Sequence, residues 1–288
     1  MCGIVGYLGE RDSLPIILNG LKRLEYRGYD SAGIAIYNGS TIASCKSKGK
    51  ISKLEKLLDK RKNMSGGIGI GHTRWATHGE PNDINAHPQF SNSKKLCLVH
   101  NGIIENYSTI KLKLIKEGFS FSSETDTEVL VNLIEFVKNK NDVKLGEAVQ
   151  IALNQVIGAY AIAVIDDDKP DEIVVAKLGS PLCIGIGEDE YFIGSDVTPF
   201  IEYTKDVVYL EDGELAIIRN HKETFFRKID DDSSISPIVS KLELSLDKIE
   251  KQGYDCLLYT SDAADEVLGV DLGGRRIIKK NMGWGGGG

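Results

Sequence analysis

The sequence predicts a layered protein of mixed α and β structure, of the α+β class. Strand-like segments lie on both sides of a central block of helices in the chain. An apolar run at Gly3–Leu8 also places a buried strand at the very start of the chain. These two observations indicate stacked sheets and helices, although periodicity alone does not choose among architectures of this kind.

The strands of the first hundred residues are predicted from short apolar runs bounded by turn residues. They are expected at 3–8, 31–37, 41–46, 67–74 and 96–100. Asn38-Gly39 is predicted to form a hairpin turn between the second and third of these strands. The polar, unpatterned stretch at 77–92 is expected to be a loop.

Helices are predicted where apolar residues recur at helical spacing. The first begins at the potential caps Asp12 and Ser13, with Pro15 in its first turn. The others are expected at about 51–62, 104–117, 125–138 and 144–156. Thr125 and Glu128 have the spacing of a capping box. From 160 to 226 the chain is predicted to form short strands broken by Gly, Asp and Pro.

The bulk composition excludes several classes of function. The net charge of the 288 residues is −7 and no basic block is present, which argues against nucleic-acid binding. No apolar run approaches the roughly 18 residues needed to cross a membrane, and no secretory pattern opens the chain. The five cysteines have neither CxxC spacing nor an even count, so we expect a reducing, cytoplasmic setting.

Three segments of different composition are predicted. Residues 1–227 are expected to form one domain, and the charged segment 228–255 an inter-domain linker. The composition changes after Asp255, where the chain resembles a translated sequencing adapter and then a homopolymer run. We therefore expect 256–288 to be a non-native, disordered tail, and the natural gene to continue beyond Asp255.

Cys2 is the first candidate for chemistry, because it directly follows the initiator Met1. A small second residue allows Met1 to be excised, which leaves an α-amine and a thiol on one residue. An α-amine has an ordinary pKa of about 8, so it can take the thiol proton at neutral pH. One residue would then supply both the nucleophile and the base.

The remaining candidates are polar residues near predicted strand ends. Asn101-Gly102 would form an oxyanion hole from a side-chain amide and a backbone N–H, or alternatively a simple turn. Arg74 would hold a substrate carboxylate and Asp126 an α-ammonium group, or each would be a surface ion-pair partner. The histidines are not spaced like metal ligands, so no metal is assigned.

Five segments together resemble one family. They are MCGIVG at 1–6, LEYRGYDSAG at 24–33, HTRWATHG at 72–79, HNGIIEN at 100–106 and SETDTE at 123–128. The first resembles the opening of N-terminal-nucleophile glutamine amidotransferases. The set over residues 1–255 resembles the glutamine–fructose-6-phosphate aminotransferase (isomerizing) family, also called glucosamine-6-phosphate synthases. The RWATH stretch separates this family from the purine-pathway and asparagine-forming relatives.

The resemblance implies a fold and a set of roles. The fold is a four-layer αββα sandwich of the N-terminal-nucleophile hydrolase type. Cys2 is implied to be the nucleophile, with its own α-amine as the base. Asn101 and Gly102 match the family's oxyanion hole, and Asp126 matches the partner of the substrate amine.

The resemblance also implies roles in substrate binding and closure. Arg74 matches the residue that holds the glutamine α-carboxylate, with Thr77 and His78 nearby. Trp75 matches the residue that gates the passage of ammonia. The loop at 77–92 matches the lid that closes over glutamine, in keeping with its polar character, since lids exclude water from an acyl-enzyme.

The implied activity is hydrolysis of L-glutamine to glutamate and ammonia through a thioester, without a cofactor. In the family, a C-terminal isomerase region uses this ammonia to convert fructose 6-phosphate to glucosamine 6-phosphate. No motif for that step is present up to Asp255, so basal hydrolysis that fructose 6-phosphate does not stimulate is expected. The full-length enzyme is expected to be a homodimer. The alternatives are the glutaminase domain of another amidotransferase and a non-catalytic glutamine-binding module.

Overall fold

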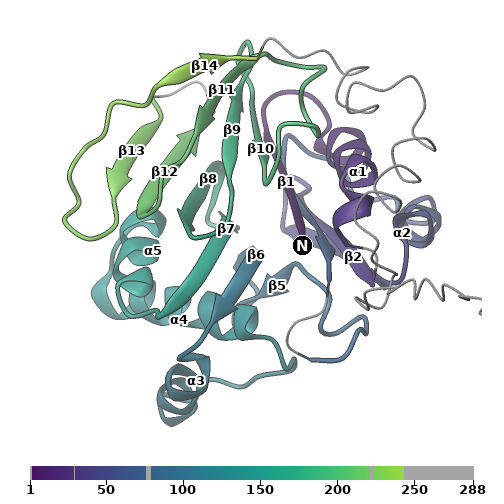
Figure 1. Cartoon of the computed structure of the whole chain (residues 1–288). Helices are drawn as coiled ribbons and strands as arrows, with labels where there is room; N and C mark the ends of the chain where they lie inside the picture. Colours follow the sequence, from purple (N-terminus) through teal and green to yellow (C-terminus); the bar gives the residue numbers. More distant parts are fainter. Residues whose placement is uncertain (1, 29, 76–78, 221–222, 243–288) are drawn as a thin grey trace, which may run out of the picture. The chain divides into compact units, whose positions relative to one another are not determined.

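The computed structural model describes residues 2–28, 30–75, 79–220 and 223–242, which form two antiparallel sheets and flanking helices (Figure 1). The strands are β1 (Gly3–Leu8), β2 (Ser31–Tyr37), β3 (Ile42–Lys48), β4 (Ile68–Arg74), β5 (Gln89–Phe90), β6 (Leu96–Ile104), β7 (Gly158–Asp166), β8 (Lys169–Leu178), β9 (Cys183–Ile186), β10 (Tyr191–Gly194), β11 (Asp206–Tyr209), β12 (Glu214–Arg219), β13 (Phe225–Lys228) and β14 (Val239–Lys241). The helices are α1 (Ser13–Arg23), the 3-10 turn η1 (Glu25–Arg27), α2 (Ile51–Leu58), α3 (Tyr107–Lys116), α4 (Asp126–Asn141) and α5 (Leu145–Leu153).

The two sheets pack face to face between two layers of helices (Figure 1). The eight-stranded sheet has the order β14-β11-β9-β10-β1-β4-β2-β3, and α1 and α2 cover its outer face. The six-stranded sheet has the order β13-β12-β8-β7-β6-β5, and α3, α4 and α5 cover its outer face. This arrangement confirms the four-layer αββα sandwich.

Alternation along the central strands explains why their sequences are continuously apolar. In β1, Ile4 and Leu8 point into the core between the sheets, whereas Val5 and Tyr7 point into the core under α1. Successive strand residues face opposite sides, so a strand with a core on each side needs apolar residues at every position. The predicted buried strand at 3–8 is therefore confirmed residue for residue.

The helix starts follow the predicted capping chemistry with one difference. The Asp12 side chain caps α1 by accepting a hydrogen bond from the Leu14 N–H at 3.3 Å. The Thr125 hydroxyl caps α4 by accepting from the Glu128 N–H at 3.2 Å. The Glu128 carboxylate, however, accepts from the Ser122 and Ser123 N–H groups rather than completing the capping box.

No helix in the described ranges is long and apolar enough to cross a membrane.

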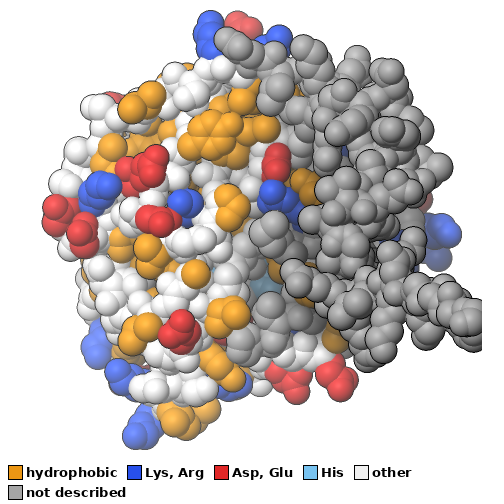
Figure 2. Space-filling view, in the orientation of Figure 1, with side chains coloured by type: hydrophobic (Ala, Val, Ile, Leu, Met, Phe, Trp, Pro, Cys, Tyr) orange, Lys and Arg blue, Asp and Glu red, His pale blue; other side chains and the backbone are white. Residues whose placement is uncertain are grey.

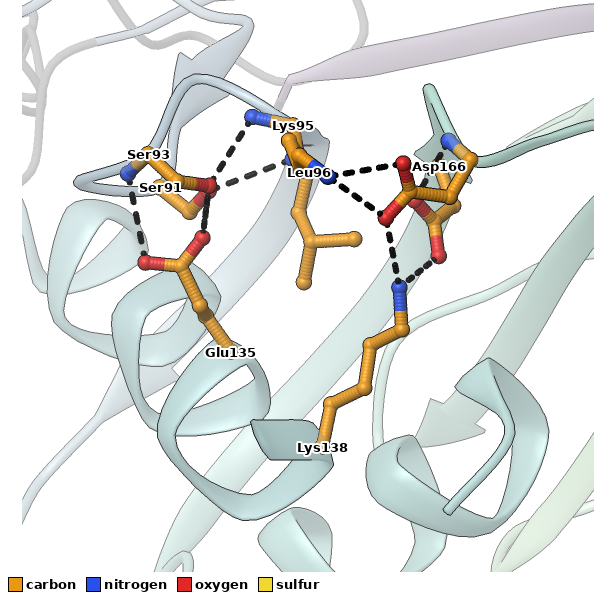
Figure 3. Close-up of polar contacts among 8 residues, drawn as sticks. Ser91, Ser93, Lys95, Leu96, Glu135, Lys138 and Asp166 are labelled. Carbon is orange, nitrogen blue, oxygen red and sulfur yellow. Dashed lines mark hydrogen bonds and ion pairs between the residues drawn. The ribbon is translucent and has the colours of Figure 1, made fainter. Parts of the chain in front are cut away.

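Polar contacts lock α4 against the strands of the six-stranded sheet (Figure 3). The Glu135 carboxylate accepts hydrogen bonds from the hydroxyls of Ser91, at 2.6 Å, and of Ser93. One turn further along, the Lys138 ammonium pairs with Asp166 at the end of β7. Because these charged groups are largely buried, losing either partner would leave an uncompensated polar group. These contacts hold α4, whose first residue is Asp126, in place against the sheet.

Three boundaries differ from the sequence-based expectation. β6 does not end at residue 100 but runs on to Ile104, because β7 continues to pair with it as far as Gly158. The predicted loop at 77–92 contains the short strand β5. Within the predicted linker, β14 pairs with β11, so the first compact unit extends to Leu242. The predicted tail at 256–288 lies outside the described residues.

Candidate active site

A cavity of about 350 Å³ opens where β1 begins, β4 ends and α4 begins. Figure 2 shows this face of the molecule, with a histidine side chain visible in a hollow near the N-terminus marked in Figure 1. The cavity brings together six of the predicted site residues, Cys2, Arg74, Trp75, Asn101, Gly102 and Asp126. Thr77 and His78 lie outside the described residues.

Cys2 directly precedes β1, and strand pairing sets its neighbour. Gly3 pairs with Thr73 of β4, which brings Cys2 beside Trp75. The Cys2 Sγ accepts a hydrogen bond from the Trp75 N–H at 3.2 Å and donates one to the Trp75 carbonyl at 3.5 Å. Burial raises the pKa of the Cys2 thiol, which is therefore protonated at neutral pH. It needs a base before it can act as a nucleophile.

Asn101 and Gly102 lie within β6, on the opposite sheet from Cys2. The Asn101 side-chain amide crosses between the sheets, where Nδ2 donates to the Cys2 carbonyl at 3.1 Å. Gly102 has a φ of +133°, and a Cβ there would lie 2.0 Å from the Ala159 carbonyl oxygen. The second residue of this pair must therefore be glycine. The alternative interpretation, a simple turn at Asn101-Gly102, is excluded because both residues continue a paired strand.

Arg74 and Asp126 are a buried cation and a buried anion at one cavity. Arg74 ends β4 with 3% of its surface exposed, and its Nη2 donates to the Gly79 carbonyl at 3.2 Å. Asp126 is 5% exposed, and its Oδ2 accepts from the Ile104 N–H at 2.9 Å. The positive end of the α4 dipole favours this carboxylate. Two opposite charges facing one small cavity suit a zwitterionic amino acid. Because both side chains are buried, the alternative of surface ion-pair partners is excluded.

Trp75 lies at the rim of the cavity with 49% of its surface exposed. Beyond it, the described part of the predicted lid is fastened at several points. The Asn85 amide donates to Glu124 at 3.0 Å, and the Lys46 ammonium donates to the Ile84 carbonyl at 3.1 Å. The segment behind the rim is thus held by β3, which carries Lys46, and by the residues that directly precede α4, which include Glu124.

A buried histidine network forms part of the cavity wall, and sequence reasoning missed it. Nε2 of His87 lies 2.7 Å from the Thr127 hydroxyl, and Nδ1 of His100 lies 3.1 Å from the same oxygen. The ring of His72 contacts that of His87, with centroids 4.4 Å apart. Burial lowers the pKa of His72 to about 3 and that of His87 well below its usual value, so both rings are neutral. His72, His100 and Thr127 lie inside the quoted motifs, which was the available signal.

Other residues of the cavity wall were also missed as site residues, among them Arg27, Ser180 and Pro181. Arg27 lies inside the motif at 24–33. Its guanidinium donates to the Ser195 carbonyl at 3.1 Å and pairs with Asp196 at 2.8 Å. Ser180 and Pro181 line the cavity from the turn after β8. They carry no motif, so no sequence signal indicates them.

This architecture and this site define the class II, N-terminal-nucleophile amidotransferases. The antiparallel αββα sandwich carries a cysteine at the start of a central strand, beside a cavity suited to an α-amino acid. The chain belongs to the glutamine amidotransferase domain family, whose model matches residues 59–237.

Among curated proteins, the chain is similar to glutamine–fructose-6-phosphate aminotransferases (isomerizing). It is 57% identical over 257 residues to that of Bacteroides thetaiotaomicron, an alignment covering 88% of this chain and 41% of the relative. It is 51% identical over 262 residues to that of Chlorobaculum tepidum, covering 88% and 42%. The chain therefore spans about two fifths of the length of these relatives. Their names match the family that the motifs of the chain resemble.

Solved structures agree on the fold. Glutamine phosphoribosylpyrophosphate amidotransferase from B. subtilis matches with a TM-score of 0.69 at 29% identity, over 80% of this chain and 50% of that one. A glutamine aminotransferase class-II domain protein from Silicibacter pomeroyi matches with a TM-score of 0.53 at 14% identity, a likeness of fold alone. The expected N-terminal-nucleophile fold is confirmed.

Proposed function

We propose that this chain hydrolyses L-glutamine to glutamate and ammonia through a thioester on Cys2. One observation carries the proposal: a thiol, an amide donor and two buried opposite charges meet at one cavity of about 350 Å³. Arg74 would hold the α-carboxylate of glutamine and Asp126 its α-ammonium group. The substrate carboxamide would then lie toward Cys2 and Asn101, which are joined by a hydrogen bond of 3.1 Å.

The proposed cycle begins with removal of Met1, which frees the α-amine of Cys2. The amine takes the thiol proton, and the thiolate attacks the carboxamide carbon. Asn101 and Gly102 donate hydrogen bonds to the oxygen that becomes negative. The protonated amine returns its proton to the leaving nitrogen, the C–N bond breaks, and ammonia departs. Water, deprotonated by the same amine, then hydrolyses the thioester to glutamate and restores the thiol.

The similarity to the aminotransferases supports a proposed role of this chain within a larger enzyme. The chain would supply ammonia to a synthase that converts fructose 6-phosphate to glucosamine 6-phosphate, and fructose 6-phosphate would bind outside the described residues. Trp75, half-exposed at the rim, would gate the ammonia, with Thr77 and His78 near the substrate carboxylate. The full-length enzyme would be a cytoplasmic homodimer. The glutaminase would occupy the compact unit that extends to Leu242 rather than ending at residue 227, the linker would follow it up to residue 255, and 256–288 would be a non-native tail.

The first test is glutamate release from L-glutamine, with the state of the N-terminus measured by mass on the same sample. Protein that has lost Met1 is expected to turn glutamine over. Protein made while methionine aminopeptidase is inhibited retains Met1, and it is expected to bind glutamine but release no glutamate, since the base is blocked. Equal turnover by the two forms would point to another base. Binding without turnover by protein with a free Cys2 would make this a glutamine-binding module.

Arg74→Lys is expected to raise the KM for glutamine about 10- to 100-fold, with a smaller change in kcat. Lysine keeps the positive charge but loses the planar fork that grips a carboxylate at two points. Steady-state kinetics with glutamine measures the effect. The matched control is Arg219→Lys. Arg219, on β12, pairs with the carboxylate of Glu172, on β8, and neither residue lines the cavity. An unchanged KM in Arg74→Lys would exclude Arg74 from substrate binding.

A further inference from the structure

The Asn101 side chain makes hydrogen bonds in two directions, and each direction requires a particular end of the amide. On one side, Nδ2 donates to the Cys2 carbonyl at 3.1 Å. On the other side, Oδ1 lies 2.9 Å from Nε2 of His72. The amide nitrogen only donates and the amide oxygen only accepts. The first contact therefore turns Oδ1 toward His72, and the second contact then requires a proton on Nε2.

His72 is held firmly enough to control its neighbour. It lies in β4, where its backbone pairs with Ile4 of β1 on one side and Gly33 of β2 on the other. Its side chain is completely buried, and one face of its ring contacts His87. Because burial keeps the imidazole neutral, the ring carries a single N–H, on Nε2 or on Nδ1. Only the first tautomer satisfies Asn101.

We propose that His72 is a positioning residue for glutamine hydrolysis, whose Nε2–H holds the Asn101 amide with its NH₂ group toward Cys2 and the cavity. The inference rests on the proposed function, because it names what aligns one of the two oxyanion donors. One amide proton is used by the Cys2 carbonyl, and the second is left for the substrate oxygen. Without the His72 donor only the Cys2 carbonyl orients the amide, so a rotation by half a turn becomes less costly, and in the rotated amide Oδ1 would face the developing negative charge.

The surrounding network connects this residue to the other end of the substrate site. His87, which contacts the His72 ring, is hydrogen-bonded through the Thr127 hydroxyl to His100. Thr127 directly follows Asp126 at the start of α4. The groups proposed to bind the substrate amine and to align the oxyanion donor thus belong to one buried polar cluster, which limits the movement of each.

Two substitutions separate the N–H donor from the shape of the ring. His72→Phe keeps a flat ring but removes the donor, and we expect kcat to fall about 10- to 100-fold with KM changed less than about threefold. His72→Gln keeps an N–H within reach of Asn101 and is expected to recover most of the rate. In an Asn101→Ala background, His72→Phe is expected to lower kcat by less than about twofold, because no amide remains to be aligned.

A binding measurement distinguishes positioning from general damage. The γ-aldehyde analogue of glutamine forms a thiohemiacetal with Cys2 and places an oxyanion in the hole. Its inhibition constant is expected to rise in His72→Phe by the factor that kcat/KM falls, while inhibition by glutamate stays unchanged. Equal weakening of both inhibitors would overturn the proposal. So would a His72→Phe penalty that persists in the Asn101→Ala background.

A third measurement does not depend on a folded variant. In unmodified protein labelled with ¹⁵N-histidine, the NMR spectrum is expected to show a protonated Nε2 and an unprotonated Nδ1 for His72. The opposite tautomer would overturn the proposal even if His72→Phe failed to fold. Absence of glutamine turnover by the unmodified protein would instead contradict the proposed function, so the two failures are distinguishable.

Discussion

Cys2→Ala is expected to abolish glutamine hydrolysis, with kcat falling about 10⁴-fold or more. The proposed thioester forms at the Cys2 Sγ, and the methyl side chain of alanine has no nucleophilic atom that could replace it. Arg74 and Asp126 remain in place in this variant, so glutamine is expected to bind with an affinity within a few fold of that of the unmodified protein. Glutamate release measures the first expectation and isothermal titration calorimetry the second.

Cys45→Ala is the matched control for this substitution. Cys45 is a free cysteine on β3, buried at 2% exposure in the core under α1 and α2. Its loss removes one buried sulfur and is expected to cost about 1 kcal/mol of the free energy of unfolding while the rate is retained. Turnover by Cys2→Ala, or a loss of rate in Cys45→Ala as large as that in Cys2→Ala, would contradict Cys2 as the nucleophile.

Gly102→Ala is expected to lower both the rate and the stability. The new Cβ would lie 2.0 Å from the Ala159 carbonyl oxygen, in backbone that cannot give way without breaking the β6–β7 pairing. The φ of +133° adds backbone strain. We expect a loss of about 3 kcal/mol or more in the free energy of unfolding. A displaced backbone N–H at the proposed oxyanion hole is expected to lower kcat about 100-fold or more.

Gly118→Ala separates the backbone strain from the steric clash. Gly118 also has a positive φ, +91°, but it follows α3 and a Cβ there meets nothing within 4 Å. This control is expected to cost about 1 kcal/mol and to leave the rate unchanged. Chemical denaturation and glutamate release measure both variants. If Gly102→Ala were as stable and as active as Gly118→Ala, the close approach of β7 would not be what requires glycine at this position.

The elements near the start of the chain were predictable because their signals are local. A continuous apolar run identified β1, and Asp12 identified the start of α1 through the hydrogen bond that its side chain makes two residues on. The same holds for the Thr125 cap of α4. Such signals depend only on a few neighbouring residues, so the tertiary structure did not override them.

The errors arose where a distant segment decided the local structure. Asn101-Gly102 resembles a turn in isolation, yet β7 pairs with this segment and keeps it extended. The charged segment after residue 227 resembles a linker, yet β14 finds a partner in β11 at the edge of the eight-stranded sheet. Strand pairing between remote segments leaves little trace in the local pattern, because the backbone supplies the hydrogen bonds.

The sequence by itself determined the chemistry: a thiol next to Met1, an amide beside a glycine, and a cation and an anion within recognisable motifs. Only the tertiary structure decided how these groups act together. Antiparallel pairing set Cys2 beside Trp75, and the packing of two sheets brought Asn101 to the Cys2 carbonyl across 99 positions of the chain. It also placed His72 behind Asn101. Side-chain chemistry is a property of each residue, whereas alignment to within a hydrogen-bond length requires the packed core.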